Sequence, residues 1–508
     1  MKRLSFVFLS ILLMAGCSGS DSSSTSDPSD TVDTPPGSGY STTRVTMGTQ
    51  CGAEPATLDD NGKRKVDALN YYFNGNAEII NGFPRQATAV LNWSCNATPL
   101  DTSMGVIPMS VFYSTKAGSE DSFEKFQEDV NTENLPKHYI DLGLLASYFS
   151  FAINQEKTEA GSILINPDLL GEVLKKGWLT KELPIDVNAA LTAAVCVLSS
   201  QNFEGSKSLD ELWQAYGTSW QAWGKDATDF DEAFTPVVTD CLANPQTSVE
   251  IPEFENSFKG YTLGLNWLVE KYGNEKLTYG WLMNISTPTE IGWLYNNLSE
   301  DQIQATFTNP VVETLQNTAY SDASYMPDFL AFDKYGADDT YPVQQLHAYP
   351  YFFNARDWDN YLTAVKQTSE DLDDMPIMLW QIPGGHIQYD GDSYTNPDHI
   401  SSFSTYLFGD ENLNEDLSNT INLDNVKLDA YHNCGEECGA VSYLKMNNYN
   451  WQTSDRMDDV INANIFAIHW QSYTYPTVGI YDIITEVTDC NDKGWLADKV
   501  KAYAGLTK

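Results

Sequence analysis

Short, continuous apolar runs recur from about residue 46 to the end of the chain, and they constrain the fold more than any other feature. The runs cover residues 89–93, 105–113, 162–165, 277–285, 329–332, 376–380 and 465–470. Several do not alternate with polar residues, which is typical of parallel strands covered on both faces. Broad apolar stripes at helical spacing lie between them, over residues 138–153, 258–272, 361–372 and 495–503.

This alternation of strands and helices predicts an α/β domain, most economically a (β/α)8-type, TIM-like barrel with long inserted loops. The pattern contains seven strands, so the barrel is irregular, has seven strands, or includes one strand that the pattern misses. A doubly wound sheet is the competing fold. The chain has no glycine-rich phosphate turn that would favour it.

The N-terminus has the layout of an export signal. Two basic residues precede a short apolar stretch, and small residues follow up to Cys17. Residues 13–17, LMAGC, resemble a bacterial lipobox, which implies that Cys17 carries a lipid. We therefore predict a signal peptide over 1–17, a flexible Ser/Thr/Asp/Pro-rich linker over 18–45, and a single barrel domain over 46–508.

Composition excludes some partners. The 508 residues carry a formal net charge of −41, so nucleic-acid binding is not expected. The chain lacks serine-hydrolase, zinc-hydrolase, Walker and dinucleotide-binding motifs, and we expect neither a metal nor a cofactor. In an oxidising compartment, we expect most cysteines to pair. The local pairs are Cys51–Cys95, Cys196–Cys241 and Cys434–Cys438, but the connectivity stays open and Cys490 is left over.

Polar and aromatic residues follow the predicted strands at the end where a (β/α)-barrel carries its chemistry. A carbohydrate would stack on the indoles and accept hydrogen bonds from the amides and imidazoles, while two carboxyl groups would do the proton work. The candidate substrate-binding residues are Asn166, Trp281, Asn284, Tyr335, Trp380, Gln381, His386, His469 and Trp470.

Asp168 and Asp333 are the candidate catalytic carboxylates. Asp168 precedes an apolar helical segment, so a helix cap is the simpler interpretation of that residue alone. Asp333 ends an apolar strand, where an uncompensated carboxylate is costly, and the following Lys334 points to the opposite face. We expect Asp168 to be the general acid and Asp333 the base or nucleophile.

Two resemblances bear on this hypothesis. Residues 163–171, ILINPDLLG, are similar to the strand-end motif of the family 6 cellulases, with Asn166 where that family has Glu. This resemblance implies a general-acid role for Asp168 and favours inversion. Residues 255–480 resemble exported bacterial glycoside-hydrolase-like barrels of undefined substrate, through segments such as 332–339, FDKYGADD, and 379–383, LWQIP.

Together these patterns predict an exported lipoprotein of the bacterial cell envelope that hydrolyses a poly- or oligosaccharide and touches the membrane through its lipid only. Within the envelope, we expect the protein at the outer membrane, on the periplasmic face or at the cell surface. The alternative is a non-catalytic, surface glycan-binding lipoprotein that uses the same aromatic rim. A lyase with Tyr335 or His386 as its base is a third hypothesis.

Overall fold

The structure is a computed structural model, and it describes the chain in segments. The described residues are 32–50, 68–72, 79–80, 83–84, 94–95, 98–99, 107–115, 122–156, 158–216, 223–287, 291–334, 353–382, 386–387, 389–391, 403–420, 428, 439–470 and 495–504.

The centre of the molecule is a curled sheet in which every strand pairing is parallel. Seven of its strands pair in the order β1-β12-β11-β10-β9-β8-β7. Their bounds are β1 Thr46–Gln50, β7 Ile107–Phe112, β8 Gly161–Ile165, β9 Leu277–Met283, β10 Phe329–Asp333, β11 Ile377–Ile382 and β12 Ile465–Trp470. A further strand, β2 (Ala68–Tyr72), pairs with β1 and with β7, the strands at the two margins, so strand pairing runs round the whole sheet. This mixed α/β architecture is compatible with a (β/α)-barrel.

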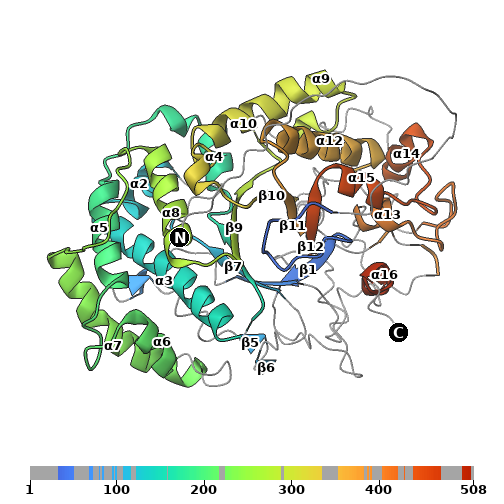
Figure 1. Cartoon of the computed structure of the whole chain (residues 1–508). Helices are drawn as coiled ribbons and strands as arrows, with labels where there is room; N and C mark the ends of the chain where they lie inside the picture. Colours follow the sequence, from blue (N-terminus) through green and yellow to red (C-terminus); the bar gives the residue numbers. More distant parts are fainter. Residues whose placement is uncertain are drawn as a thin grey trace, which may run out of the picture.

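Helices cover the outside of the sheet (Figure 1). The α-helices of the described residues are α2 Phe123–Asp129, α3 Leu135–Asn154, α4 Leu169–Lys175, α5 Val187–Leu198, α6 Leu209–Tyr216, α7 Trp223–Ala243, α8 Phe258–Tyr272, α9 Glu300–Ile303, α10 Asn309–Gln316, α12 Ala355–Asp371, α13 Phe403–Phe408, α14 Ala440–Leu444, α15 Met457–Asn462 and α16 Trp495–Ala504. Two-residue strands form the small hairpins β3–β4 (Ile79–Ile80 with Phe83–Pro84) and β5–β6 (Ser94–Cys95 with Thr98–Pro99). From β7 to β12, strands and helices alternate as the sequence predicts.

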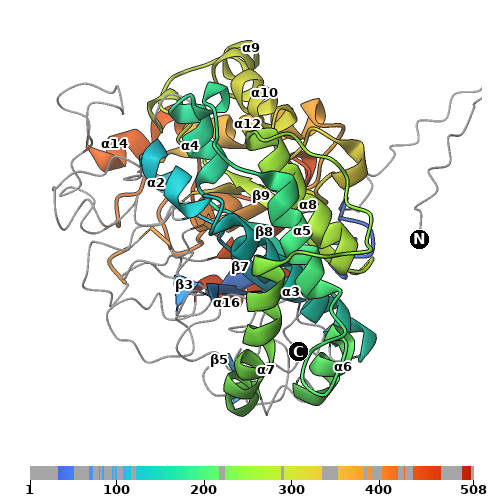
Figure 2. The same cartoon turned by 90° about the vertical axis from the view of Figure 1, so that its left-hand side faces the viewer.

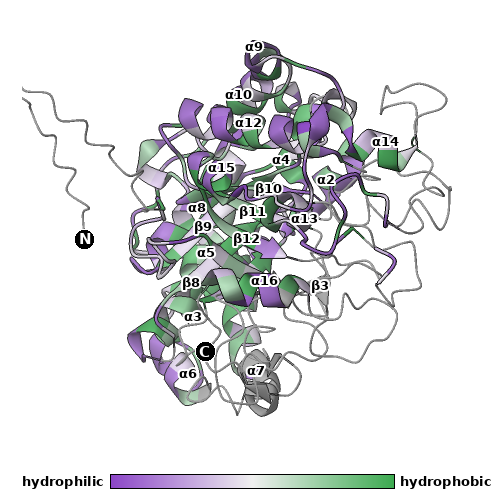
Figure 3. Ribbon diagram, turned by 90° about the vertical axis from the view of Figure 1, so that its right-hand side faces the viewer, coloured by the Kyte–Doolittle hydropathy of each residue, from purple (hydrophilic) through white to green (hydrophobic). Residues whose placement is uncertain are grey.

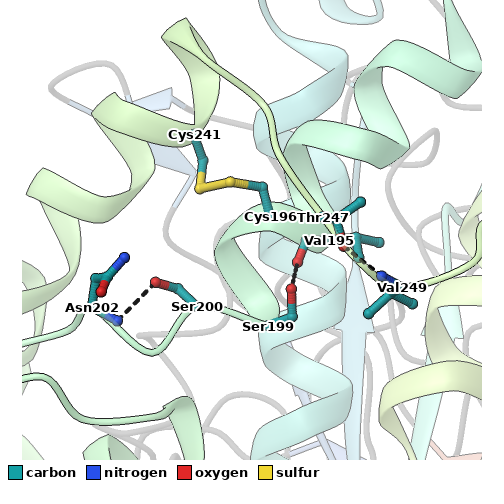
Figure 4. Close-up of a disulfide and its surroundings, with 8 residues drawn as sticks. All are labelled: Val195, Cys196, Ser199, Ser200, Asn202, Cys241, Thr247 and Val249. Carbon is teal, nitrogen blue, oxygen red and sulfur yellow. Dashed lines mark hydrogen bonds between the residues drawn. A yellow bond between two sulfur atoms is a disulfide. The ribbon is translucent and has the colours of Figure 1, made fainter.

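The connection between β8 and β9 holds the largest insertion among the described residues, and it is helical. Helices α4 to α8 all lie in it, and α3 and α5 pack against each other at its base (Figure 2). The Cys196–Cys241 disulfide joins α5 to α7, which confirms that predicted pair (Figure 4). The other predicted pairs lie where the structure describes no side chain.

Residues 32–45 pack against the sheet, so the predicted linker over 18–45 is wrong in its second half. Val32 and Tyr40 are 4% and 5% exposed, and the Tyr40 ring meets Phe466 of β12 edge-on, with centroids 4.8 Å apart. Gly39 has a φ of +73°, and a Cβ on it would lie 2.9 Å from the Cβ of Ala160. The packing of this segment was not predicted, because only two buried side chains occur in a Ser/Pro/Asp-rich stretch.

Six of the seven predicted strands match β7 to β12, and the seventh, residues 89–93, lies outside the described residues. The sequence missed β1 and β2 because their sequences, TMGTQ and ALNYY, contain no apolar run. Hydrophobic residues concentrate on the central strands and hydrophilic residues on the outer helices (Figure 3). Within the described residues, no helix is long and apolar enough to cross a membrane.

Candidate functional site

Three polar side chains follow three strands that are neighbours in the sheet. Asp168 comes shortly after β8, Asn284 directly follows β9, and Asp333 is the last residue of β10. Strands β9 and β10 are in register up to Met283 and Phe332, so Asn284 and Asp333 lie side by side. Consecutive parallel strands end at the same edge, and this brings all three residues together.

The Asn284 amide joins the two carboxyl groups. Its Nδ2 donates to Asp168 Oδ1 at 2.9 Å and to Asp333 Oδ2 at 3.0 Å. These two carboxylate oxygens therefore lie at most about 5.9 Å apart, the sum of the two bond lengths. The prediction that Asp168 and Asp333 meet is thus confirmed.

Asp168 occupies the N-cap position of α4 but does not cap the helix. Its φ of 76° is left-handed, and its side chain makes no capping hydrogen bond. A non-glycine residue in this region costs on the order of 1–3 kcal/mol. Asn166, two residues earlier, is also left-handed, with a φ of 41°. The strained turn aims the Asp168 carboxylate at Asn284, so the helix-cap interpretation is wrong.

Asp333 lies on the opposite face of β10 from Lys334. The Lys334 ammonium sits 4.6 Å from the centre of the Phe353 ring and 6.0 Å from that of Trp358 on α12, so Lys334 points outward to the helices. Because side chains alternate along a strand, Asp333 points to the inner face. Asp333 is 7% exposed, and its Oδ1 accepts the backbone N–H of Ile285 at 3.2 Å.

Burial raises the pKa values of both carboxyl groups. For Asp333, burial and then the charge of Asp168 raise the pKa to about 7, against the hydrogen bonds from Asn284 and Ile285. For Asp168, burial raises the pKa, the Asn284 bond opposes it, and the charge of Glu172 adds to the rise. Two close carboxyl groups that share a proton can supply a general acid together with a base or nucleophile.

Asn166 is fully buried, and its amide is used within the protein. Its Oδ1 accepts the backbone N–H of Ser114 at 2.6 Å, and its Nδ2 donates to the Tyr261 hydroxyl at 3.1 Å. Ser114 follows β7 and Tyr261 lies on α8. Asn166 therefore ties β7, β8 and α8 together, which corrects its predicted role as a substrate-binding residue.

Trp281 and Trp470 belong to the core, so their predicted role as sugar-stacking platforms is wrong. Both are 0% exposed. The Trp281 indole donates to Asn266 Oδ1 on α8 at 2.8 Å, which places it between sheet and helix. Trp470 packs against Phe403 and Phe408 of α13.

Trp380 and Gln381 lie on β11, the strand next to Asp333. Trp380 is the register partner of Asp333 on the neighbouring strand β11, so both residues belong to the same face, but Trp380 is only 2% exposed. Gln381 has a φ of 53° at a bulge in β11 and is 5% exposed. Trp380 thus lies next to Asp333, and both Trp380 and Gln381 present little surface to a ligand.

The two candidate histidines lie in different surroundings. His469 on β12 is 0% exposed, and burial lowers its pKa to about 3, so its imidazole stays neutral. A Cβ on Gly48 of β1 would lie 2.6 Å from the ring, so His469 fills the space of that absent side chain. His386 Nδ1 lies 3.0 Å from Asp410 Oδ2, and its ring stacks on Trp495 of α16.

Two predicted residues, Tyr335 and Cys17, lie outside the described residues, so the structure does not describe their placement. Within the described part of the chain, no group of three or more histidine, cysteine, aspartate or glutamate residues is placed to hold a metal ion.

The structure adds one residue that sequence reasoning did not assign to the site. Gly171 of α4 lies so close to Asn284 that a Cβ on it would fall 2.1 Å from Asn284 Oδ1. The sequence signal was weak: a glycine inside a predicted helix, three residues after a candidate carboxylate. Its role could be recognised only once the structure showed that Asn284, directly after β9, faces it.

The chain matches no protein-family model and no curated protein. The carboxyl pair and its surroundings therefore carry the functional argument.

Proposed function

We propose that the protein is a glycoside hydrolase that cleaves a poly- or oligosaccharide with Asp168 and Asp333. The observation that carries this proposal is the shared hydrogen-bond donor: one amide nitrogen of Asn284 contacts both carboxyl groups. Two close carboxyl groups with raised pKa values destabilise a fold, and glycosidic bond cleavage requires such a pair.

The environments of the two residues favour different roles. A general acid must hold its proton near neutrality, and the pKa of Asp333 is raised to about 7. Asp168 is partly exposed, whereas Asp333 is buried. We therefore propose Asp333 as the acid and Asp168 as the ionised partner, the reverse of the assignment from sequence.

The separation of the carboxyl groups favours retention of anomeric configuration. Retaining enzymes hold their carboxyl groups roughly 5–5.5 Å apart, and inverting enzymes roughly 6.5–9.5 Å apart. The bound of about 5.9 Å between the facing oxygens lies below the inverting range. In this proposal, the Asp168 carboxylate attacks the anomeric carbon while Asp333 protonates the leaving oxygen. Water, deprotonated by Asp333, then releases the sugar from Asp168.

A glycan-binding protein without catalysis is the second candidate, but the described residues favour it less. That hypothesis depends on an aromatic rim, and Trp281, Trp380 and Trp470 are all at most 2% exposed. Binding alone also gives no reason for two carboxyl groups with raised pKa values to share one donor.

The proposed setting follows from the sequence and from the architecture. We propose that the complete domain is a (β/α)8-type barrel with the carboxyl pair at the carboxyl ends of its strands. The N-terminal sequence supports export and lipid attachment at Cys17, so the substrate would be a carbohydrate met in the cell envelope.

The test is a reducing-end assay of the full chain on a panel of poly- and oligosaccharides. Asp168→Asn and Asp333→Asn should each lower the rate on the cleaved glycan by roughly 10²- to 10⁴-fold, because each removes a group that takes part in the chemistry. The anomer released first, followed by proton NMR, should have the configuration of the substrate.

Asp357→Asn is the matched control. Asp357 is also fully buried with a pKa raised to about 7 by burial, but it belongs to the N-terminal capping box of α12. Its variant should keep the rate within a few-fold of the wild type. Cleavage that survives both substitutions in the pair refutes the proposal, and saturable glycan binding without product supports the binding hypothesis.

A further inference from the structure

The side chain of Asn284 is held at both of its polar ends. Its Nδ2 group has two hydrogens, and each is directed to one carboxyl group, Asp168 or Asp333. An amide in this position cannot rotate about its last bond without losing both bonds, because the oxygen would then face two acceptors.

Helix α4 holds the other end of the amide. A Cβ on Gly171 would lie 2.1 Å from Asn284 Oδ1, 3.0 Å from its Cγ and 3.2 Å from its Cβ, so the side chain lies directly on the helix backbone. Helix α4 also contacts strand β9, which ends directly before Asn284. The short segment from Asp168 to Gly171 thus supplies both one carboxyl group and the surface that fixes the donor between the two.

We propose that Asn284, seated on Gly171, is a positioning residue that sets the separation of the two carboxyl groups and keeps them in one geometry. The catalytic part of this inference rests on the proposed hydrolysis, whereas the seating and bridging do not. Two carboxylates in a poorly solvated site repel each other, and the bridging amide is the donor that offsets this repulsion on both sides. A side chain at position 171 would push Asn284 away, and the carboxyl groups would lose their shared donor.

A purely structural role for Gly171 makes a different prediction. In a helix interior, Gly→Ala is stabilising by roughly 1 kcal/mol when the added methyl group meets no obstacle. If the contact with Asn284 only fills space, then the variant should change stability equally at all pH values. A positioning role changes the pH dependence, because the lost bonds favour the ionised carboxyl groups.

The experiment measures urea unfolding of the full chain at pH 5 and at pH 8 for Gly171→Ala and the control Gly439→Ala. A Cβ on Gly439, at the N-cap of α14, meets nothing within 4 Å. We expect the urea midpoint of Gly171→Ala to fall more between pH 5 and pH 8 than that of the wild type. The midpoint of Gly439→Ala should fall by the same amount as that of the wild type. Two other titratable groups lie at the pair, and neither is changed. The charge of Glu172 of α4 acts on Asp168, and the hydroxyl of Tyr361 of α12 donates to the backbone oxygen of Asp333 at 3.2 Å.

Asn284→Ser provides a second variant if Gly171→Ala does not fold. Serine has one hydroxyl donor, so it can serve at most one carboxyl group, and the same steeper fall is expected. On a cleaved glycan, either variant should lower kcat by roughly 10²-fold with little change in KM, as expected for misplaced reacting groups. An unchanged pH dependence in both variants overturns the positioning role. If the variants show the steeper fall in urea midpoint but the wild type cleaves no glycan, then the hydrolase proposal is overturned and the positioning role is not.

Discussion

Replacing Asp333 with asparagine should remove a pH-dependent loss of stability. The folded chain raises the pKa of this carboxyl group from 3.8 to about 7, so the folded state binds the proton more tightly than the unfolded state. The contribution of this carboxyl group to the stability of the wild type is therefore fully present below about pH 4 and is lost as the pH rises through about 7. At about 1.36 kcal/mol per pKa unit, the full loss is about 4 kcal/mol, of which roughly 2.5 kcal/mol falls between pH 5 and pH 8.

The variant changes one further contact. An asparagine at position 333 turns an NH₂ group toward one of the donors, Asn284 or the Ile285 N–H, at a cost of about 1–3 kcal/mol that does not depend on pH. The difference in unfolding free energy between Asp333→Asn and wild type should thus move in favour of the variant by roughly 2.5 kcal/mol from pH 5 to pH 8. Urea unfolding followed by tryptophan fluorescence measures this difference.

An exposed acid provides the control. The Glu370 side chain on α12 is 55% exposed, and Glu370→Gln should keep the same free-energy difference from wild type at both pH values. If the Asp333→Asn difference is also the same at pH 5 and pH 8, then the carboxyl group is not held in its protonated form by the fold. The reasoning about the pair would then be refuted.

Two further predictions concern the scaffold. Tyr40→Ala should lower the free energy of unfolding by about 3–5 kcal/mol, because it removes a buried ring packed on Phe466. If urea unfolding shows a loss below about 1 kcal/mol, then residues 32–45 are only loosely attached. The double variant Cys196→Ala/Cys241→Ala opens a disulfide with a sequence separation of 45, which should cost about 4 kcal/mol; unchanged protection of α5 and α7 amides in hydrogen exchange would contradict this.

The architecture was predictable where strands are apolar throughout and not where they are mixed. Strands β7 to β12 are buried on both faces, so their sequences read as continuous apolar runs. The sequences of β1 and β2 carry glycine, threonine, glutamine and asparagine, and their place in the sheet depends on pairing partners far along the chain. The N-terminal packing segment depends on Val32 and Tyr40 alone, and local composition concealed it.

The carboxyl pair was predictable because Asp168 and Asp333 follow strands close in chain order, and such strands lie close in a parallel barrel. Alternation along a strand could also have excluded Trp281, since residues 281 and 284 point to opposite faces of β9. The roles of Asn284 and Gly171 were not predictable. They depend on side-chain orientation across three strands and a helix, which sequence spacing does not specify.

The most direct test of the central claim compares Asp168→Asn, Asp333→Asn and the double variant on the glycan that the wild type cleaves fastest. If the two carboxyl groups act as one unit, then the double variant should lose no more kcat/KM than the more damaged single variant, because either loss alone disables the pair. Losses that multiply would mean that the two groups act independently. A rate close to wild type in any of the three variants, or no cleavage across the whole panel by the wild type, would contradict the account.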